Sequence, residues 1–226
     1  MPDPVRTEVP VNALVDGPFA VADVRGYAAV KVKVRDAAGI GLVGAVRDAV
    51  GPRVALRVDA NGAWDVDTAV LMIERLARYD LEYVEQPVES LDELARVRRR
   101  VTVRIAADEC IRTIEDACRL RSLDAADIVV LKQQPLGGVR AALDVADAAG
   151  VPAVVSSMME TSVGIAAGVA LAAALPELPF ACGLATLAAL PGDVTHYPLS
   201  PVDGVLPVRS VVPAADLLAR YEEAST

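Results

Sequence analysis

"VALRVDANGAWDVDTAVLMIERLARYDLEYVEQP", residues 54–87, contains the unit that repeats along this chain. It begins with a β-like apolar run that ends at Asp59 and closes with a second such run that carries Glu85. Between them, apolar residues recur at helical spacing over residues 65–79, with Asp65 as a candidate N-cap. The stretch therefore predicts strand, helix and strand, which is the building block of parallel α/β sheets.

The same unit recurs along the whole chain. Each β-like run carries one marker residue that is expected to lie at the C-terminal end of its strand, and the markers are Asn12, Lys33, Asp59, Glu85, Asp108, Lys132, Ser156 and Gly183. Successive markers are 21 to 27 residues apart, which leaves room for one strand, one helix and two short loops. Eight units predict an α/β fold of the (β/α)8 TIM-barrel type. A doubly wound open sheet is the alternative, but the glycine-rich phosphate turn expected after its first strand is missing.

Local signals predict where individual helices begin and end. Ser90 and Glu93 form a capping box at the start of "SLDELARVRRR", and Gly150 is a candidate C-cap after "GGVRAALDVADAA". No linker or low-complexity segment divides the chain. We therefore expect a single domain over residues 1–226, with the barrel over about 8–210 and a C-terminal helix or tail over 211–226.

Composition excludes several classes of function. A net charge of −9 argues against nucleic-acid binding, which needs a basic face. The first residues lack the pattern of a secretory signal, and the longest apolar stretch (163–175) is too short to span a bilayer. His196 is the single histidine, so histidine triads and multi-histidine metal sites are excluded. We expect a cytoplasmic protein with neither a nucleic-acid nor a membrane partner.

The marker residues also predict a site. In a parallel barrel the C-terminal strand ends face one mouth, which gathers Lys33, Asp59, Glu85, Asp108, Lys132 and Ser156. A turn or a helix cap is the simplest explanation for one aspartate at a strand end. Three carboxylates on consecutive strands would repel one another, and a divalent cation removes that conflict. Ligation by oxygen alone, with open positions, suits magnesium.

A cation there would hold a substrate carboxylate and stabilise the enediolate formed when a base removes the α-proton. "AAVKVKV", residues 28–34, directs Lys31 and Lys33 to the same side of a strand. In a half-exposed sheet they would face solvent, whereas in a barrel they face the interior. Lysine serves as a base where burial or nearby cations lower its pKa. Lys132 would face Lys33 across the mouth.

The motifs "KVK", "RVDANGAW", "LEYVEQP", "IAADE" and "VVSSMMETSVGIAAG" resemble the enolase superfamily in its muconate-lactonizing-enzyme-like branch. Within that branch they resemble the o-succinylbenzoate synthase family of actinobacteria, from about Val9 to Arg209. The resemblance implies a modified (β/α)7β barrel and a Mg²⁺ cofactor, with Mn²⁺ as the alternative. The family normally carries an α+β capping domain before the barrel, and we expect that domain to be absent because only about eight residues precede the first predicted strand.

The resemblance implies a role for each matching residue. The metal ligands would be Asp59, Glu85 and Asp108. Lys33 would be the acid/base, and Lys132 would stabilise the enolate as a cation. Residues that contact these groups or the substrate would be Lys31, Arg57, Asn61 and Glu109. The wall around the succinyl part of the substrate would be Ser156, Ser157, Gly183 and Leu184.

Three functions follow as hypotheses. The first is the dehydration of 2-succinyl-6-hydroxy-2,4-cyclohexadiene-1-carboxylate to o-succinylbenzoate in menaquinone biosynthesis, through lysine proton abstraction and a metal-stabilised enediolate. The second is racemisation of N-succinylamino acids or another epimerisation, because two opposed lysines can each serve one face of an α-carbon. The third is a capless barrel without turnover, either a binding protein or an inactive fragment. The expected partner is a small-molecule carboxylate, and the oligomeric state is left open.

Overall fold

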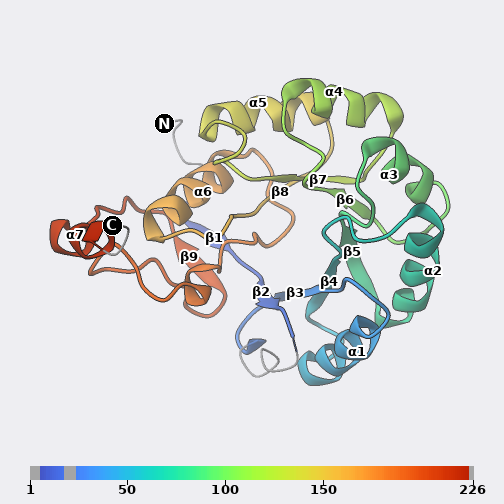
Figure 1. Cartoon of the computed structure of the whole chain (residues 1–226), viewed down its shortest axis with the longest axis horizontal. Helices are drawn as coiled ribbons and strands as arrows, with labels where there is room; N and C mark the ends of the chain where they lie inside the picture. Colours follow the sequence, from blue (N-terminus) through green and yellow to red (C-terminus); the bar gives the residue numbers. More distant parts are fainter. Residues whose placement is uncertain (1–5, 18–23, 224–226) are drawn as a thin grey trace.

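The computed structural model describes residues 6–17 and 24–223, which form a curled parallel sheet surrounded by helices (Figure 1). Seven strands pair in chain order: β2 (Ala13–Val15), β3 (Ala29–Lys33), β4 (Ala55–Asp59), β5 (Leu81–Glu85), β6 (Ile105–Ala107), β7 (Ile128–Leu131) and β8 (Ala153–Val155). The helices that follow β3 to β8 are α1 (Gly39–Val50), α2 (Val66–Leu76), α3 (Leu91–Arg98), α4 (Ile114–Leu123), α5 (Val139–Ala149) and α6 (Ser162–Ala174). The alternation confirms the predicted parallel barrel architecture.

Two residues close the barrel where a full eighth strand was predicted. The Asn12 N–H donates to the carbonyl of Cys182 (2.9 Å), and the Gly183 N–H donates to the carbonyl of Val155 (2.8 Å). Residues 182–183 thus bridge the two edges of the sheet, beside β2 and β8. After Gly183 the chain turns towards the short 3-10 helix η3 (Leu187–Ala189), so the predicted strand is limited to these bridges.

The first predicted strand is divided in two. β1 (Glu8–Pro10) pairs antiparallel with β9 (Val205–Pro207), and only β2 enters the barrel. The change of partner occurs at Val11, whose N–H donates to the carbonyl of Gly204 (2.8 Å). Asn12 therefore lies at the start of the first barrel strand, and the prediction that it marks the end of that strand is wrong.

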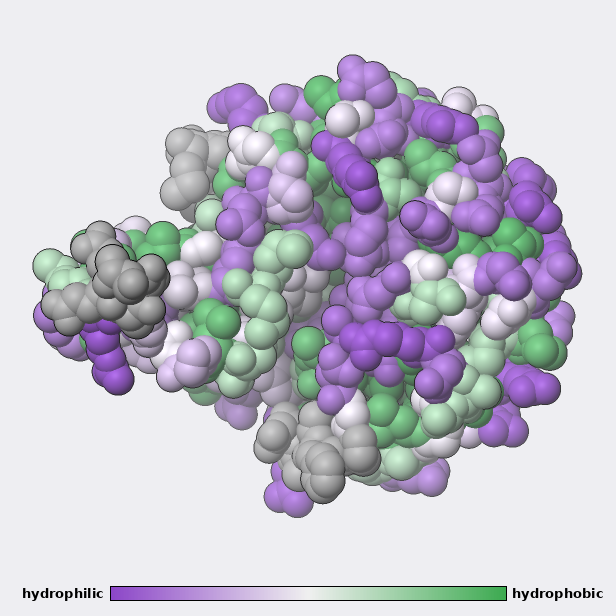
Figure 2. Space-filling model, viewed as in Figure 1, coloured by the Kyte–Doolittle hydropathy of each residue, from purple (hydrophilic) through white to green (hydrophobic). Residues whose placement is uncertain are grey.

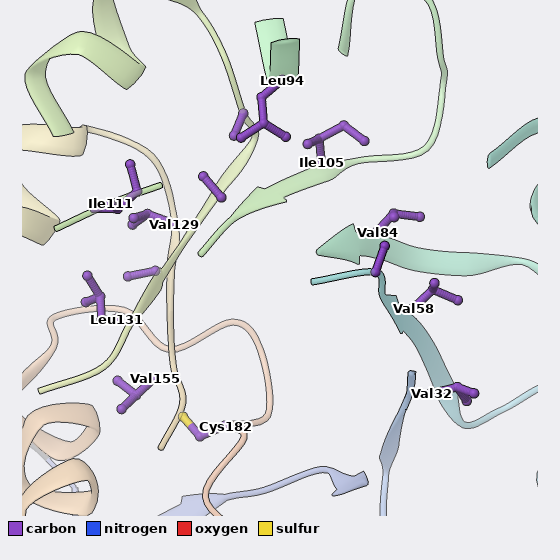
Figure 3. Close-up of a cluster of buried hydrophobic side chains, with 14 of the residues drawn as sticks. Val32, Val58, Val84, Leu94, Ile105, Ile111, Val129, Leu131, Val155 and Cys182 are labelled. Atoms are coloured by element: carbon purple, nitrogen blue, oxygen red, sulfur yellow. The ribbon is translucent and has the colours of Figure 1, made fainter. Parts of the chain in front are cut away.

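Alternate residues of each strand face opposite sides of the barrel wall. The valines of β3 are fully buried in the main core, and Figure 3 shows Val32, Val58 and Val84 in that core together with Leu94 of α3. The interior face carries two charged layers, because Lys31 is in register with Arg57 and, two residues further, Lys33 is in register with Asp59. The other half of the interior is apolar and consists of Tyr83, Ala106, Ile128, Val130 and Val154.

The predicted helix limits are confirmed. Asp65 accepts a hydrogen bond from the Thr68 N–H (2.8 Å) at the start of α2, which continues into the 3-10 helix η2 (Ala77–Tyr79). The capping box of Ser90 begins α3, and α5 ends at Gly150, whose φ of 63° lies in the left-handed region. These local signals fix the helices around the sheet.

α7 (Ala215–Glu223) lies apart from the strands at the left of Figure 1. Figure 2 shows hydrophilic residues over much of the helical rim, with hydrophobic ones between them. No helix in the part of the chain that the structure describes is long and apolar enough to cross a membrane. The ends of the predicted domain, residues 1–5 and 224–226, lie outside the described residues.

Candidate active site

Three carboxylates stand next to one another at the C-terminal ends of neighbouring strands. Asp59 ends β4, Glu85 ends β5 in register with it, and Asp108 directly follows β6. All three residues are at most 4% exposed. The strand alternation explains this position, since each carboxylate belongs to the interior face of its own strand.

In this structure, lysine ammonium groups contact these carboxylates. Lys31 Nζ lies 2.7 Å from Glu85 Oε1 and 3.4 Å from Asp59 Oδ2, and Lys132 forms an ion pair with Asp108. Burial raises the pKa of Glu85, the Lys31 ammonium opposes this shift, and the other two carboxylates add to it. As the side chains stand, no three His, Cys, Asp or Glu residues of the described ranges are grouped so that they could hold a metal ion.

The donor set nevertheless fits a hard divalent cation. Three buried carboxylates share only two ammonium groups, and burial together with the neighbouring carboxylates raises the pKa of Glu85, a conflict that a divalent cation would relieve. The backbone holds two of the carboxylate-bearing residues in place: the Asn61 N–H donates to Asp59 Oδ1 (3.0 Å), and the Asp108 N–H donates to Gln86 Oε1 (2.8 Å). Carboxylate oxygens held in fixed positions are ligands that Mg²⁺ prefers in proteins.

The lysines of the site differ in their partners. Lys33 forms no ion pair with any residue that the structure describes, whereas Lys31 and Lys132 each do. Burial by itself lowers the pKa of Lys132, but the carboxylates of Asp108, Glu85 and Glu109 together raise it above its usual value. Lys132 is therefore held as a cation, whereas the Lys33 side chain has no carboxylate partner among the described residues.

A cavity of about 220 Å³ opens among these residues. Nine of the predicted site residues line it: Lys31, Lys33, Asp59, Asn61, Glu109, Lys132, Ser156, Ser157 and Gly183. Six further residues complete the lining: Asn12, Leu14, Met158, Met159, Ala185 and Thr186. Charged groups thus lie beside a neutral wall of hydroxyl, methionine and glycine residues.

Four of the predicted site residues do not line the cavity: the carboxylate residues Glu85 and Asp108, and also Arg57 and Leu184. Arg57 is buried below it, donates to Glu82 Oε2 (2.6 Å) and the carbonyl of Ala181 (2.6 Å), and lies over the ring of Tyr83. The Leu184 side chain is fully buried and faces Gly168 of α6, where an added Cβ would come within 2.7 Å of Leu184 Cδ2. The side chain of residue 184 therefore points outward from the barrel and not into the cavity.

Asn12, Leu14, Ala185 and Thr186 were not predicted as site residues. Asn12 and Leu14 are two residues apart and lie on the same side of the chain. The alternation that directs Lys31 and Lys33 to the interior therefore also predicts an interior position for these two residues. Thr186 reaches the cavity through the irregular turn before η3, and a repeat of strands contains no signal for it.

Known proteins share the architecture of this chain. A family model described as "Enolase C-terminal domain-like" matches residues 19–213. The chain belongs to the enolase superfamily. Among solved members, the muconate cycloisomerase of Pseudomonas fluorescens is 26% identical, with a TM-score of 0.88 over 96% of this chain and 66% of its own.

Two superfamily relatives are closer in sequence. The o-succinylbenzoate synthase of Thermobifida fusca is 60% identical over 98% of this chain and 73% of its own length. The enzyme of the same name from Mycolicibacterium smegmatis is 46% identical over 96% of this chain and 70% of its own. A dipeptide epimerase from Enterococcus faecalis, solved with Mg and the dipeptide L-Leu-L-Tyr, is 31% identical with a TM-score of 0.83 over 92% of this chain and 64% of its own.

Proposed function

We propose that this chain is a hydro-lyase that converts 2-succinyl-6-hydroxy-2,4-cyclohexadiene-1-carboxylate into o-succinylbenzoate, a step of menaquinone biosynthesis. The observation that carries the proposal is one cavity lined by an unpaired Lys33 and a cationic Lys132, beside three buried carboxylates. Relatives at 46% and 60% identity that carry the synthase name support this reaction over racemisation. We also propose the cytoplasm as its location.

Asp59, Glu85 and Asp108 are the proposed ligands of Mg²⁺, for which Mn²⁺ is the closest substitute. When bound, the cation supplies positive charge to the substrate carboxylate as negative charge develops next to it. Lys31 keeps two of these side chains in place, since it contacts both Asp59 and Glu85. Asn61 orients Asp59 through its N–H and Glu109 through its side-chain amide (2.9 Å).

In the proposed reaction Lys33 both removes and returns a proton, and the substrate loses one molecule of water overall. The Lys33 amine takes the α-proton, and the electrons of that C–H bond form the new ring double bond. The neighbouring C–O bond breaks, and the Lys33 ammonium gives its proton to the departing hydroxide, which leaves as water. The Lys132 ammonium, held by Asp108, stabilises the negative charge that builds up between the two bond changes.

The neutral wall is the proposed site of the succinyl arm. Ser156, Ser157 and Gly183 line it. A Cβ on residue 183 would come within 2.7 Å of Ser156 Oγ, so the glycine keeps that hydroxyl beside the cavity. The wall is uncharged, so we propose that the fit of the arm against it depends on shape.

Purified chain should convert the cyclohexadiene substrate to the aromatic product when Mg²⁺ is present, and should stop when a chelator removes the metal. The rise in ultraviolet absorbance of o-succinylbenzoate measures this. A parallel incubation of an N-succinylamino acid in deuterium oxide measures exchange at its α-carbon. Exchange without dehydration would favour a racemase, and magnesium binding with neither reaction would favour a barrel without turnover.

A further inference from the structure

One hydroxyl contact joins two separate segments of the cavity wall. Thr186 Oγ1 lies 2.9 Å from Ser157 Oγ and 3.0 Å from the carbonyl of Met158. Ser157 in turn contacts the carbonyl of Gly183 through its N–H (3.0 Å) and its hydroxyl (3.1 Å). The loop after β8 and the segment after Gly183 are thereby connected where both face the cavity.

The two hydroxyl protons are already used in these contacts. The carbonyl of Met158 can only accept, so the Thr186 hydroxyl donates its single proton there. Ser157 then donates to Thr186 Oγ1 or to the carbonyl of Gly183. Neither hydroxyl has a second proton for a ligand, so both hold the wall together and present only lone pairs to the cavity.

Few other hydrogen bonds hold this part of the wall, although Leu184 packs in the core. The bridge to β8 ends at Gly183, and η3 does not begin until Leu187. Among the hydrogen bonds of the described residues, those of Thr186 Oγ1 alone link residues 184–190 to the loop 156–161. The segment between the bridge and η3 therefore depends on one threonine hydroxyl for its hydrogen-bonded position against that loop.

We propose that Thr186 is a positioning residue for substrate binding. It fixes Ser157 and Met158 as the surface against which the succinyl arm lies, and it takes no part in proton transfer. This inference rests on the proposed function and extends it to a residue outside the lysine and carboxylate set. Removal of the hydroxyl should weaken substrate binding and leave the chemical step, which belongs to Lys33, nearly unchanged.

Three variants test this role. Thr186→Val removes the hydroxyl at nearly constant volume, and Thr186→Ser restores it. As a control, Ser122→Ala removes an exposed hydroxyl that donates to a carbonyl within α4 (2.9 Å), a helix that contributes no residue to the cavity lining. We expect KM to rise about tenfold in Thr186→Val with kcat within about twofold, and to return towards wild type in Thr186→Ser. An unchanged KM in Thr186→Val, or an equal defect in Ser122→Ala, overturns the proposal.

Amide hydrogen exchange gives a second readout that needs no turnover. Exchange at Ser157, whose N–H bonds the carbonyl of Gly183, should accelerate in Thr186→Val and stay at the wild-type rate in Thr186→Ser. If the wild type neither dehydrates the substrate nor binds o-succinylbenzoate with Mg²⁺, the proposed function fails, and the exchange rates decide the role of Thr186. Equal rates in wild type and Thr186→Val contradict it.

Discussion

Lys31 and Lys33 share one face of β3 and have different partners. Lys31 lies one layer deeper and contacts Glu85 and Asp59, whereas Lys33 reaches the cavity without an ion pair among the described residues. Sequence spacing was enough to predict their common orientation and their two layers. It could not predict the ion pairs of Lys31, because these depend on side chains that arrive from β4 and β5.

Removal of the Lys31 ammonium should destabilise the metal-free protein. Lys31→Met leaves the buried Glu85 without its cation, and breaking one side of a buried ion pair costs about 3–5 kcal/mol. Urea unfolding in the presence of a chelator measures the loss in free energy of unfolding. Lys33→Met is the matched control and should change it by less than about 0.5 kcal/mol. Equal losses in the two variants would refute the structural role of Lys31.

Gly183 tests the shape of the neutral wall. Gly183→Ala places a Cβ 2.7 Å from Ser156 Oγ, so the serine hydroxyl must shift. We expect KM for the cyclohexadiene substrate to rise several-fold, because the succinyl arm is proposed to lie there. Steady-state kinetics measures this, with Gly41→Ala as control, since an added Cβ at residue 41 meets nothing within 4 Å. A KM equal to that of wild type would count against this wall as the substrate contact.

The sequence predicts the ends of helices better than the pairing of strands. The starts of α2 and α3 and the end of α5 follow from local capping residues, so neighbouring positions in the chain suffice. The division of the first strand and the two-residue closure at 182–183 depend on partners far along the chain, Gly204 and Val155 among them. The family resemblance places Leu184 in the wall, whereas alternation from Gly183 turns its side chain outward towards Gly168 of α6.

The capping box at the start of α3 should contribute to the stability of the protein. Ser90→Ala removes the oxygen that accepts from the Glu93 N–H and should lower the free energy of unfolding by about 1 kcal/mol. Thermal or urea unfolding measures this, and Ser122→Ala, on an exposed helical position, should stay within about 0.5 kcal/mol of wild type. If the two variants prove equally stable, the cap contributes nothing to α3.

The barrel as a whole divides its interior into a charged half and an apolar half. Lys31, Arg57, Asp59 and Glu85 belong to β3 to β5, and Asp108 follows β6. Ile128, Val130 and Val154 fill the side of β7 and β8. The repeat of about 25 residues predicts this mouth, since it needs only strand order and alternation. The irregular segment that contributes Ala185 and Thr186 has no such repeat, so the sequence does not predict its place at the cavity.

Magnesium binding should be visible in the stability of the whole chain. At about 100 times its dissociation constant, a ligand of the folded state adds ~2.7 kcal/mol to the free energy of unfolding. Titration with MgCl2 should therefore raise the melting temperature of the wild type and of Asp92→Asn, which changes an exposed carboxylate on α3. Asp59→Asn should lose most of this increase. An equal increase in Asp59→Asn would place the metal elsewhere.

The proposed reaction depends on the Lys33 amine, and one kinetic comparison tests that dependence. Aromatisation of 2-succinyl-6-hydroxy-2,4-cyclohexadiene-1-carboxylate is followed in wild type and Lys33→Ala at saturating Mg²⁺, after calorimetry has established that both bind the metal. Loss of the acid/base should lower kcat by about 10²–10⁴-fold or more. Turnover in Lys33→Ala at the wild-type rate would contradict the mechanism.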